Sequence, residues 1–217
     1  MRPLYYGNVY ESLVIKRTIM KYEYTTLVES PLGLIRVQGS QTHIQYLKFE
    51  DGLDANTLMD TSTSIDKKAD WANDCIQQLE HYFSGKLQQF NLPIDAQGSE
   101  FQKRVWHKLC DVKSGELSSY QQLASAAGNI KAVRAVASAN ARNPIWLLIP
   151  CHRIIGSDRA LRGYAGGIER KAKLLQLEKH ILDSNSSALI NEKTKVLQGI
   201  TLEPYANKIF PHRPLLK

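Results

Sequence analysis

Short runs of β-branched and aromatic residues, interrupted by turn sequences, fill the chain between residues 22 and 50. Three such runs cover residues 22–30, 33–40 and 43–50, and the sequences SPLG and GSQT lie between them. Runs of this composition bounded by Gly, Pro and Ser are typical of strands joined by tight turns. The pattern predicts an antiparallel meander of three strands, followed by a polar loop at 51–66.

The spacing of apolar residues becomes helical in the sequence DWANDCIQQLEHYFSG, residues 70–85. Its apolar face comprises Ala72, Cys75, Ile76, Leu79, Tyr82 and Phe83. Gly85 suits the end of this helix, because glycine tolerates the left-handed backbone that often follows a last turn. Cys75 falls on the apolar face, and we therefore expect it to be a core residue.

Two capping boxes mark further helix starts after the linker FNLPIDAQG. Ser99 with Gln102, and Ser119 with Gln122, each combine a hydroxyl and an amide that satisfy the free N–H groups of a first helical turn. The first of these helices turns four residues inward, namely Phe101, Val105, Trp106 and Leu109. Cys110 closes this helix, and we expect it to be structural as well.

A third helix follows the second after a turn built on Gly128 and Asn129, which gives a helix-turn-helix pattern. Its inward stripe is Val133, Val136 and Ala137. Alanines keep the helix slim, and Arg134 and Ser138 lie one turn apart on another face. Close packing of an Ala-rich helix explains this pattern, and so does insertion of a slim helix into a nucleic-acid groove.

These elements predict an α+β fold with two domains. A small N-terminal antiparallel-sheet domain with one helix covers residues 21–95, and a mostly helical domain with the helix-turn-helix covers residues 96–182. An arm at 1–20 and a tail at 183–217 flank them. The chain of 217 residues is 43% hydrophobic, which is enough for a sizeable core.

The sequence also indicates where in the cell the protein acts. The N-terminus lacks the pattern of a secretion signal, and no apolar run approaches the roughly 18 residues of a membrane span. We therefore expect a soluble intracellular protein without membrane contact, nuclear in a eukaryote and cytoplasmic in a prokaryote.

Three cysteines are too few and too far apart for a disulfide framework, and no CxxC pair indicates zinc. We expect neither a metal nor a cofactor.

The net charge of +7 is unevenly distributed along the chain. Residues 1–96 carry 9 Lys and Arg against 12 Asp and Glu, whereas residues 97–182 carry 14 against 6. A basic module of this kind is typical of proteins that bind a polyanion such as nucleic acid, although many proteins with a basic half bind none.

An apolar run ends at Pro150 in the sequence WLLIPCHRIIG, and a thiol, an imidazole and a guanidinium follow side by side. A thiol becomes a good nucleophile as its thiolate, which requires a base or a positive field nearby. His152 can reach Cys151 through one water, or directly if the chain turns sharply after Pro150. Arg153 adds positive charge or serves the structure. The motif indicates a reactive cysteine, although it is short.

Glu178 lies in the middle of the apolar stripe of a last helix at 168–182. The other members of the stripe are Leu174, Leu175, Leu177, Ile181 and Leu182. A carboxylate in such a stripe needs a partner. It either forms a salt bridge with a nearby Arg or Lys, or orients a histidine that activates a cysteine.

The sequence RGYAGG, residues 162–167, precedes this helix. Small residues around Tyr164 let a flat ligand approach the backbone closely, unless the segment is an ordinary glycine turn with one packed tyrosine.

Taken together, these motifs resemble the O6-alkylguanine-DNA alkyltransferases, also called methylated-DNA–protein-cysteine methyltransferases. The matching sequences are FQKRVWHKL, SSYQQLASAAGN, KAVRAVASANARNP, IPCHRIIG, and GYAGG followed by ERKAKLLQLE, in this order within residues 99–180. SPLG and LEHYFSGKLQQFNLP are weaker echoes of the family's smaller domain. Family members often carry serine at the position of Ala165, and residues 183–217 have no match.

The resemblance implies roles for four residues of a catalytic group. Cys151 matches the alkyl acceptor, and His152 matches the base that takes the thiol proton through a water. Glu178 matches the carboxylate that orients this histidine and so keeps the thiol partly ionised near neutral pH. Asn143 matches the hinge asparagine that braces the active-site loop.

The resemblance also implies a base pocket and a DNA-binding helix. Tyr120 matches a tyrosine that crowds the target phosphate and hydrogen-bonds the flipped base, and Tyr164 lines the pocket. The Ala165 N–H is expected to face the guanine O6, and the carbonyls of Cys151 and Ile154 its amino group. Arg134 matches the finger that fills the place of the flipped nucleotide through the minor groove. Ala135 and Ser138 lie beside it on the same helix.

The activity that this family implies is DNA repair by irreversible, single-turnover transfer of an alkyl group to Cys151. The substrate is duplex DNA containing O6-alkylguanine, with O4-alkylthymine as a second substrate, and the protein is expected to be a monomer. We also expect Glu178→Gln to slow transfer with little loss of stability. Three alternatives are a non-enzymatic relative that binds alkylated DNA, a helix-turn-helix regulator, and a cysteine hydrolase; the stoichiometry of the reaction separates them.

Overall fold

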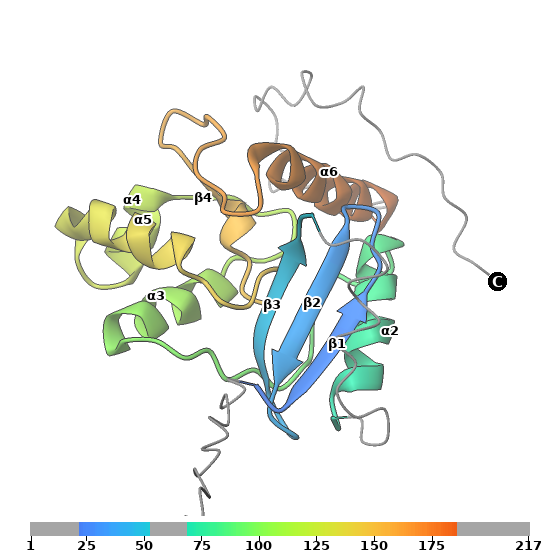
Figure 1. Ribbon diagram of the computed structural model, residues 1–217. Coiled ribbons are helices and arrows are strands. Elements are labelled where there is room, and N and C mark those ends of the chain that lie inside the picture. The colour runs from blue at the N-terminus through green and yellow to red at the C-terminus, as the bar shows by residue number, and fades with distance from the viewer. Residues whose placement is uncertain (1–21, 53–68, 186–217) are drawn as a thin grey trace, which may run out of the picture.

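The three predicted strands are present as one antiparallel sheet in a computed structural model that describes residues 22–52 and 69–185. Strands β1 (Tyr24–Val28), β2 (Leu34–Gly39) and β3 (Ile44–Glu50) lie in this order. Helix α2 (Ala72–Phe83) lies beside β1 (Figure 1). Its side chains Cys75, Leu79 and Tyr82 share one core with the sheet residues Ile35, Val37 and Leu47. Gly85 follows α2 with a φ of 78°, in the left-handed region expected there.

The outer edge of β3 is occupied by two later parts of the chain. Ile44 pairs in parallel with Ile94 of the linker, and Leu47 pairs in parallel with Ile145. The second pairing has two hydrogen bonds, from the Leu47 N–H to the Pro144 carbonyl at 3.0 Å and from the Trp146 N–H to the Leu47 carbonyl at 2.7 Å. The N-terminal sheet therefore fixes the segment that leads to Cys151.

Both predicted capping boxes are present, in α3 (Glu100–Cys110) and α4 (Tyr120–Ala126). The predicted third helix is wrong in one respect. Asn129 caps a 3-10 turn, η1 (Ile130–Ala132), and the α-helix α5 covers only Val133–Ala141. A 3-10 helix has three residues per turn, fewer than an α-helix. The residues of α5 that follow η1 therefore turn a different face to the core than they would in one continuous α-helix. The buried residues of α5 are accordingly Val136, Ala139 and Asn140. The predicted inward residues Val133 and Ala137 are half-buried.

The two cysteines that we expected to be structural differ in burial. Cys75 is 1% exposed and belongs to the core, as predicted. Cys110 is exposed, because it is the last residue of α3, where the buried face of the helix ends at Leu109. The expectation that Cys110 is a packed residue is therefore wrong.

Helix α6 (Ile168–Asn185) ends the described part of the chain and lies next to the β1–β2 turn and the end of β3 (Figure 1). Among the described helices, none combines the length and apolar character of a membrane span. The predicted arm at 1–20, nearly all of the loop at 51–66 and most of the tail at 183–217 lie outside the described residues. The boundaries between the predicted domains stay a prediction.

Candidate active site

Cys151 lies at the start of a 3-10 turn, η2 (Cys151–Arg153), directly after Pro150, and is 3% exposed. The residues after the turn form β5 (Ile154–Ile155), which pairs in parallel with β4 (Ser118–Ser119). Cys151 therefore lies between two paired segments. The segment before it pairs with β3 at Ile145, and β5 after it pairs with β4. Because Ser119 also caps α4, the same pairing carries Tyr120 toward the site.

Asn143 braces the turn from a fully buried position. Its Nδ2 donates to the Ile149 carbonyl at 2.7 Å and to Cys151 Sγ at 3.1 Å. Its Oδ1 accepts from the Ile145 N–H at 3.0 Å. Within the loop closed by these bonds, Leu147 has a φ of 69°, which is uncommon for a residue with a side chain. One carboxamide thus stabilises a strained loop and contacts the thiol.

Burial raises the pKa of the Cys151 thiol to about 11, although the Asn143 hydrogen bond and the charge of Lys171 act in the opposite direction. This pKa favours the neutral thiol near pH 7, because the sulfur lies out of water. The expectation that Cys151 is partly ionised through a water-mediated relay to His152 stays a prediction.

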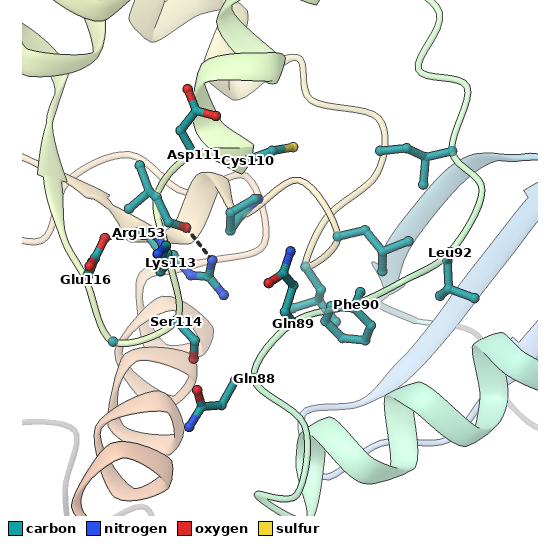
Figure 2. Close-up of a pocket in the computed structure, with 16 residues that line it drawn as sticks. Gln88, Gln89, Phe90, Leu92, Cys110, Asp111, Lys113, Ser114, Glu116 and Arg153 are labelled. Carbon is teal, nitrogen blue, oxygen red and sulfur yellow. Dashed lines mark hydrogen bonds between the residues drawn. The ribbon is translucent and has the colours of Figure 1, made fainter. Parts of the chain in front are cut away.

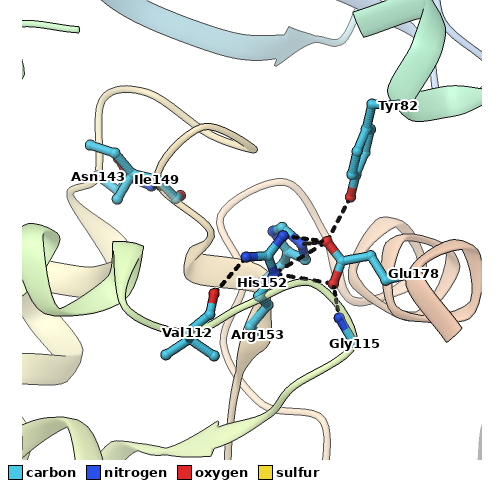
Figure 3. Close-up of polar contacts among 8 residues, drawn as sticks. All are labelled: Tyr82, Val112, Gly115, Asn143, Ile149, His152, Arg153 and Glu178. Carbon is cyan, nitrogen blue, oxygen red and sulfur yellow. Dashed lines mark hydrogen bonds and ion pairs between the residues drawn. The ribbon is translucent and has the colours of Figure 1, made fainter. Parts of the chain in front are cut away.

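Glu178 is the centre of a fully buried polar cluster (Figure 3). Its carboxylate accepts from His152 Nε2 at 3.0 Å, from Arg153 Nη2 at 2.7 Å and from Tyr82 Oη at 2.9 Å. Arg153 Nε and the Gly115 N–H also donate to it. Glu178 therefore forms the salt bridge with an arginine that the sequence left open, and it also hydrogen-bonds His152. That this histidine activates Cys151 stays a prediction.

The protonation states of this cluster follow from its charges. Burial favours the neutral acid, but the charges of His152 and Arg153 and their hydrogen bonds hold the pKa of Glu178 well below its usual range. Burial lowers the pKa of His152 in spite of the neighbouring carboxylate. A neutral imidazole that donates Nε2–H to Glu178 has an acceptor at Nδ1. That Nδ1 is buried and has no partner among the described residues.

The predicted base-pocket residues Tyr120 and Tyr164 meet at the loop at 162–167. Tyr120, half-buried, donates to the Gly163 carbonyl at 3.1 Å. The Tyr164 ring lies 5.4 Å from the Trp146 ring and 6.5 Å from His152. Burial, and then the neighbouring Cys151, raise the pKa of both tyrosines.

Three buried polar atoms in this part of the chain lack a described partner: His152 Nδ1, Tyr164 Oη and Asn140 Oδ1. Such atoms are uncommon in native structures, and each calls for an explanation. Asn140 also interacts with Tyr120, whose pKa its amide lowers against the larger effect of burial. Two of the three atoms thus belong to His152 and Tyr164, which are predicted site residues.

Lys171 is a buried cation that the sequence reasoning missed. Its Nζ donates to the Ile154 carbonyl and, at 2.7 Å, to the Arg162 carbonyl. Burial lowers its pKa to about 8. A usable signal existed, because Lys171 falls on the same helical face as Leu175 and Glu178. The Ile154 carbonyl, expected to face the base, thus already accepts one hydrogen bond, while Ala165 is exposed.

Comparison with known proteins decides the family. The 6-O-methylguanine DNA methyltransferase ribonuclease-like domain matches residues 20–96, and the DNA binding domain of the same name matches residues 100–180. A methylated-DNA–protein-cysteine methyltransferase of Methanosarcina barkeri is 41% identical over 165 residues, or 73% of this chain and 99% of that protein. The chain belongs to the 6-O-methylguanine DNA methyltransferase family. The resemblance predicted from the motifs is thereby confirmed.

Further relatives of this methyltransferase family agree. The constitutive methylated-DNA–protein-cysteine methyltransferase of Bacillus subtilis is 40% identical over 72% of this chain and 95% of its own. The crystal structure of the Mycobacterium tuberculosis O6-methylguanine methyltransferase has a TM-score of 0.63 at 33% identity, covering 77% of this chain and 96% of that one. The structure of M. tuberculosis OGT in complex with DNA has a TM-score of 0.60 at 34% identity, covering 71% and 92%. The predicted α+β fold is confirmed.

Within the region that matches the family's DNA binding domain, the predicted DNA-binding residues lie together on α5. Arg134 and Ala135 are exposed and Ser138 is half-buried. On its inner side, α5 packs against α3, where Trp106 Nε1 donates to the Ala139 carbonyl at 2.8 Å. Ile130, at the start of η1, is 52% exposed. The helix therefore presents one cation and small residues outward from a rigid base.

A cavity of about 650 Å³ lies next to Arg153, between the segments at 88–94 and 110–116 (Figure 2). Arg153, Val112 and Cys110 line it, and Arg153 Nη1 donates to the Val112 carbonyl at 2.6 Å. Cys151 does not line this cavity. Among the described side chains, no three His, Cys, Asp or Glu residues gather as a metal site requires.

Proposed function

We propose that this chain repairs alkylated DNA by transferring the alkyl group of O6-alkylguanine to Cys151. The observation that carries the proposal is a buried thiol next in sequence to a histidine that Glu178 binds at Nε2 and whose Nδ1 has no partner among the described residues. Membership in the 6-O-methylguanine DNA methyltransferase family supplies the substrate class. O4-alkylthymine is the second substrate that we propose.

The reaction proposed is an in-line displacement at the alkyl carbon. The Cys151 thiol proton passes to His152 Nδ1 through a water as the S–C bond forms and the C–O6 bond breaks. The proton finally resides on the released guanine, so no other reactant is consumed. Because the unreacted thiol is neutral, with a pKa of about 11, proton removal accompanies the attack and does not precede it.

The thioether that forms is stable, because a thiolate is a poor leaving group from an unactivated alkyl carbon, even toward a water that His152 could activate. A sulfur–carbon bond of this kind is not reversed by general acid–base catalysis, unlike an ester or thioester. We therefore propose one turnover per molecule, which also distinguishes this function from that of a cysteine hydrolase.

The base must leave the helical stack to reach a sulfur that is 3% exposed. In our proposal α4 and α5 bind duplex DNA, and Arg134 enters the minor groove and occupies the place of the flipped nucleotide. The loop at 162–167 and Tyr120 then receive the base. The three unpaired atoms near Cys151 are available to its polar edge. Phosphate contacts from the basic region offset the energy of flipping, a few kcal/mol.

The central test measures what remains on the protein after reaction. The full chain is incubated with excess duplex oligonucleotide that contains O6-methylguanine, and its mass and tryptic peptides are analysed. We expect about one methyl group per chain, on Cys151. Cys151→Ser should accept none and still bind the duplex, since the exposed Arg134 of α5 remains. Methyl groups on Cys75 or Cys110, or release of many guanines per chain, would contradict the proposal.

Arg134→Ala should separate base flipping from chemistry. Free O6-benzylguanine needs no flipping, so its reaction rate should change by less than about twofold. Reaction with the duplex should fall by about tenfold or more, because the emptied stack loses the side chain that fills it. Arg142→Ala, which removes another exposed cation near the end of α5, is the matched control. Equal losses on both substrates would show that Arg134 serves the fold.

A further inference from the structure

Arg170, in the first turns of α6, joins parts of the chain that are distant in sequence. Its Nε donates to the Leu32 carbonyl at 2.9 Å, and its Nη1 donates to Asp51 Oδ2 at 2.9 Å and to the Gly166 carbonyl at 3.1 Å. Its Nη2 donates to the other Asp51 oxygen. A guanidinium has five N–H donors in a fixed plane, and four contacts use them here. The arginine side chain is 20% exposed.

The partners of Arg170 belong to two functional regions. Leu32 lies in the β1–β2 turn and Asp51 directly follows β3, so both belong to the N-terminal sheet (Figure 1). Gly166 belongs to the loop at 162–167 that we propose as the base pocket. In the β1–β2 turn, a glycine leaves room for the guanidinium. Gly33 has a φ of 113°, and a Cβ there would lie 3.2 Å from Arg170 Nη2.

The same guanidinium also contacts the first of three neighbouring aromatic rings, the last of which is Tyr164 of the loop. It lies 4.9 Å above the ring of Phe49, which lies 6.1 Å from the ring of Trp146. Trp146 in turn lies 5.4 Å from Tyr164. Gly166 fits between these two rings, since a Cβ there would approach Tyr164 to 2.7 Å and Trp146 to 2.9 Å. The position of Arg170 therefore fixes both the backbone and the ring of the loop.

Two other side chains donate hydrogen bonds to backbone carbonyls of this loop, and neither has a described contact with the N-terminal sheet. Tyr120 donates to the Gly163 carbonyl, and Lys171 donates to the Arg162 carbonyl. Both donors belong to the region that matches the DNA binding domain. Arg170 alone among these three donors also contacts the N-terminal sheet.

We propose that Arg170 is a positioning residue through which the N-terminal sheet sets the affinity of the base-pocket loop for its substrate. This inference rests on the proposed function. It assigns a task to the sheet beyond folding, because Asp51 holds the guanidinium that donates to the Gly166 carbonyl. An ion pair whose carboxylate is 75% exposed contributes little to stability. The pair can therefore be weakened while the fold is retained.

The test compares Arg170→Lys and Asp51→Asn with Glu50→Gln. Lysine keeps the charge but cannot donate to three carbonyl and carboxylate groups in one plane. Glu50→Gln removes a neighbouring ion pair, with Arg36 at 3.0 Å, which lies within the sheet and does not touch the loop. Rates of reaction with free O6-benzylguanine are measured against its concentration. Amide hydrogen exchange at 163–167 and the thermal midpoint are measured for each protein.

We expect Arg170→Lys to raise the half-saturating concentration of O6-benzylguanine about fivefold, the effect of losing about one hydrogen bond. Asp51→Asn should raise it about twofold. The limiting rate should stay within about twofold, because Cys151, His152 and Glu178 are not contacted. Exchange at 163–167 should accelerate in both variants and remain unchanged in Glu50→Gln.

Two results would overturn the inference. One is unchanged exchange at 163–167 in Arg170→Lys, which would show that the tie does not hold the loop. The other is a lower limiting rate with an unchanged half-saturating concentration, which would place the effect in the chemistry. If the unsubstituted protein does not alkylate Cys151 at all, the proposed function fails, and the exchange measurement alone then decides whether Arg170 positions the loop.

Discussion

Replacing Glu178 with Gln is expected to lower the free energy of unfolding by about 3–5 kcal/mol, because it leaves the buried guanidinium of Arg153 without its counter-charge. Alkyl transfer should slow by about a hundredfold, the lower end of what a positioned acid–base group contributes. This revises the expectation from sequence that stability changes little. An amide can accept from His152 or from Tyr82, but it cannot balance the charge of Arg153, 2.7 Å away.

The effect of Glu178→Gln on the free energy of unfolding should depend on pH. The pKa of Glu178 in the folded chain is held below its unfolded value, which is about 4.3. Its contribution to stability is therefore fully present above about pH 5 and is lost as pH falls through the folded pKa. The difference in unfolding free energy between the unsubstituted protein and Glu178→Gln should be constant from about pH 7 to 5 and shrink below about pH 4.

Urea unfolding of both proteins over this pH range measures the difference, and the pH profile of O6-benzylguanine transfer measures the rate. Glu80→Gln, which changes an exposed glutamate of α2, is the control and should behave as the unsubstituted protein. An unfolding midpoint of Glu178→Gln equal to that of the control would mean that Arg153 does not depend on this carboxylate.

Asn143→Ala is expected to destabilise the chain by about 2–5 kcal/mol, because it leaves the Ile149 carbonyl and the Ile145 N–H buried without partners. Asn143→Asp should be worse. One carboxylate oxygen can still accept from Ile145, but the other faces the Ile149 carbonyl and the thiol, where Asn143 now donates. Both variants should lose most alkyl transfer, since the positive φ of Leu147 loses its brace.

Thermal and urea unfolding, with the rate of O6-benzylguanine transfer, check this prediction. Asn73→Ala alters an exposed asparagine of α2 and should change stability by less than about 1 kcal/mol. Asn143→Ala that is no less stable than Asn73→Ala would show that the backbone holds the loop unaided. Asn143→Asp that is more stable than Asn143→Ala would show that the donor, the Nδ2 group, is dispensable.

Local signals predicted the elements that depend on neighbouring residues. The runs at 22–50 and the capping boxes of Ser99 and Ser119 each specify structure within a few residues, and each is present. The helical wheel also isolated Glu178 as a carboxylate that needs a partner. These inferences succeed because sequence spacing fixes which side chains share a face.

The remaining features depend on contacts between distant parts of the chain. No local pattern indicates that Tyr82 of α2 donates to Glu178, 96 residues later. The parallel pairing of Leu47 with Ile145 is equally non-local. The burial that raises the pKa of Cys151 was missed for the same reason, because the motif shows which groups are adjacent in sequence but not how deeply the fold buries them.

The pairing of Ile145 with the edge of β3 has a consequence for how the chain folds. Contacts of such long sequence separation form slowly, because the entropy of closing a large loop must be overcome before they contribute. The contact of Tyr82 with Glu178 likewise joins residues 96 positions apart. During synthesis, we therefore expect Cys151 to resemble an ordinary exposed cysteine until the N-terminal sheet and the last helix have come together.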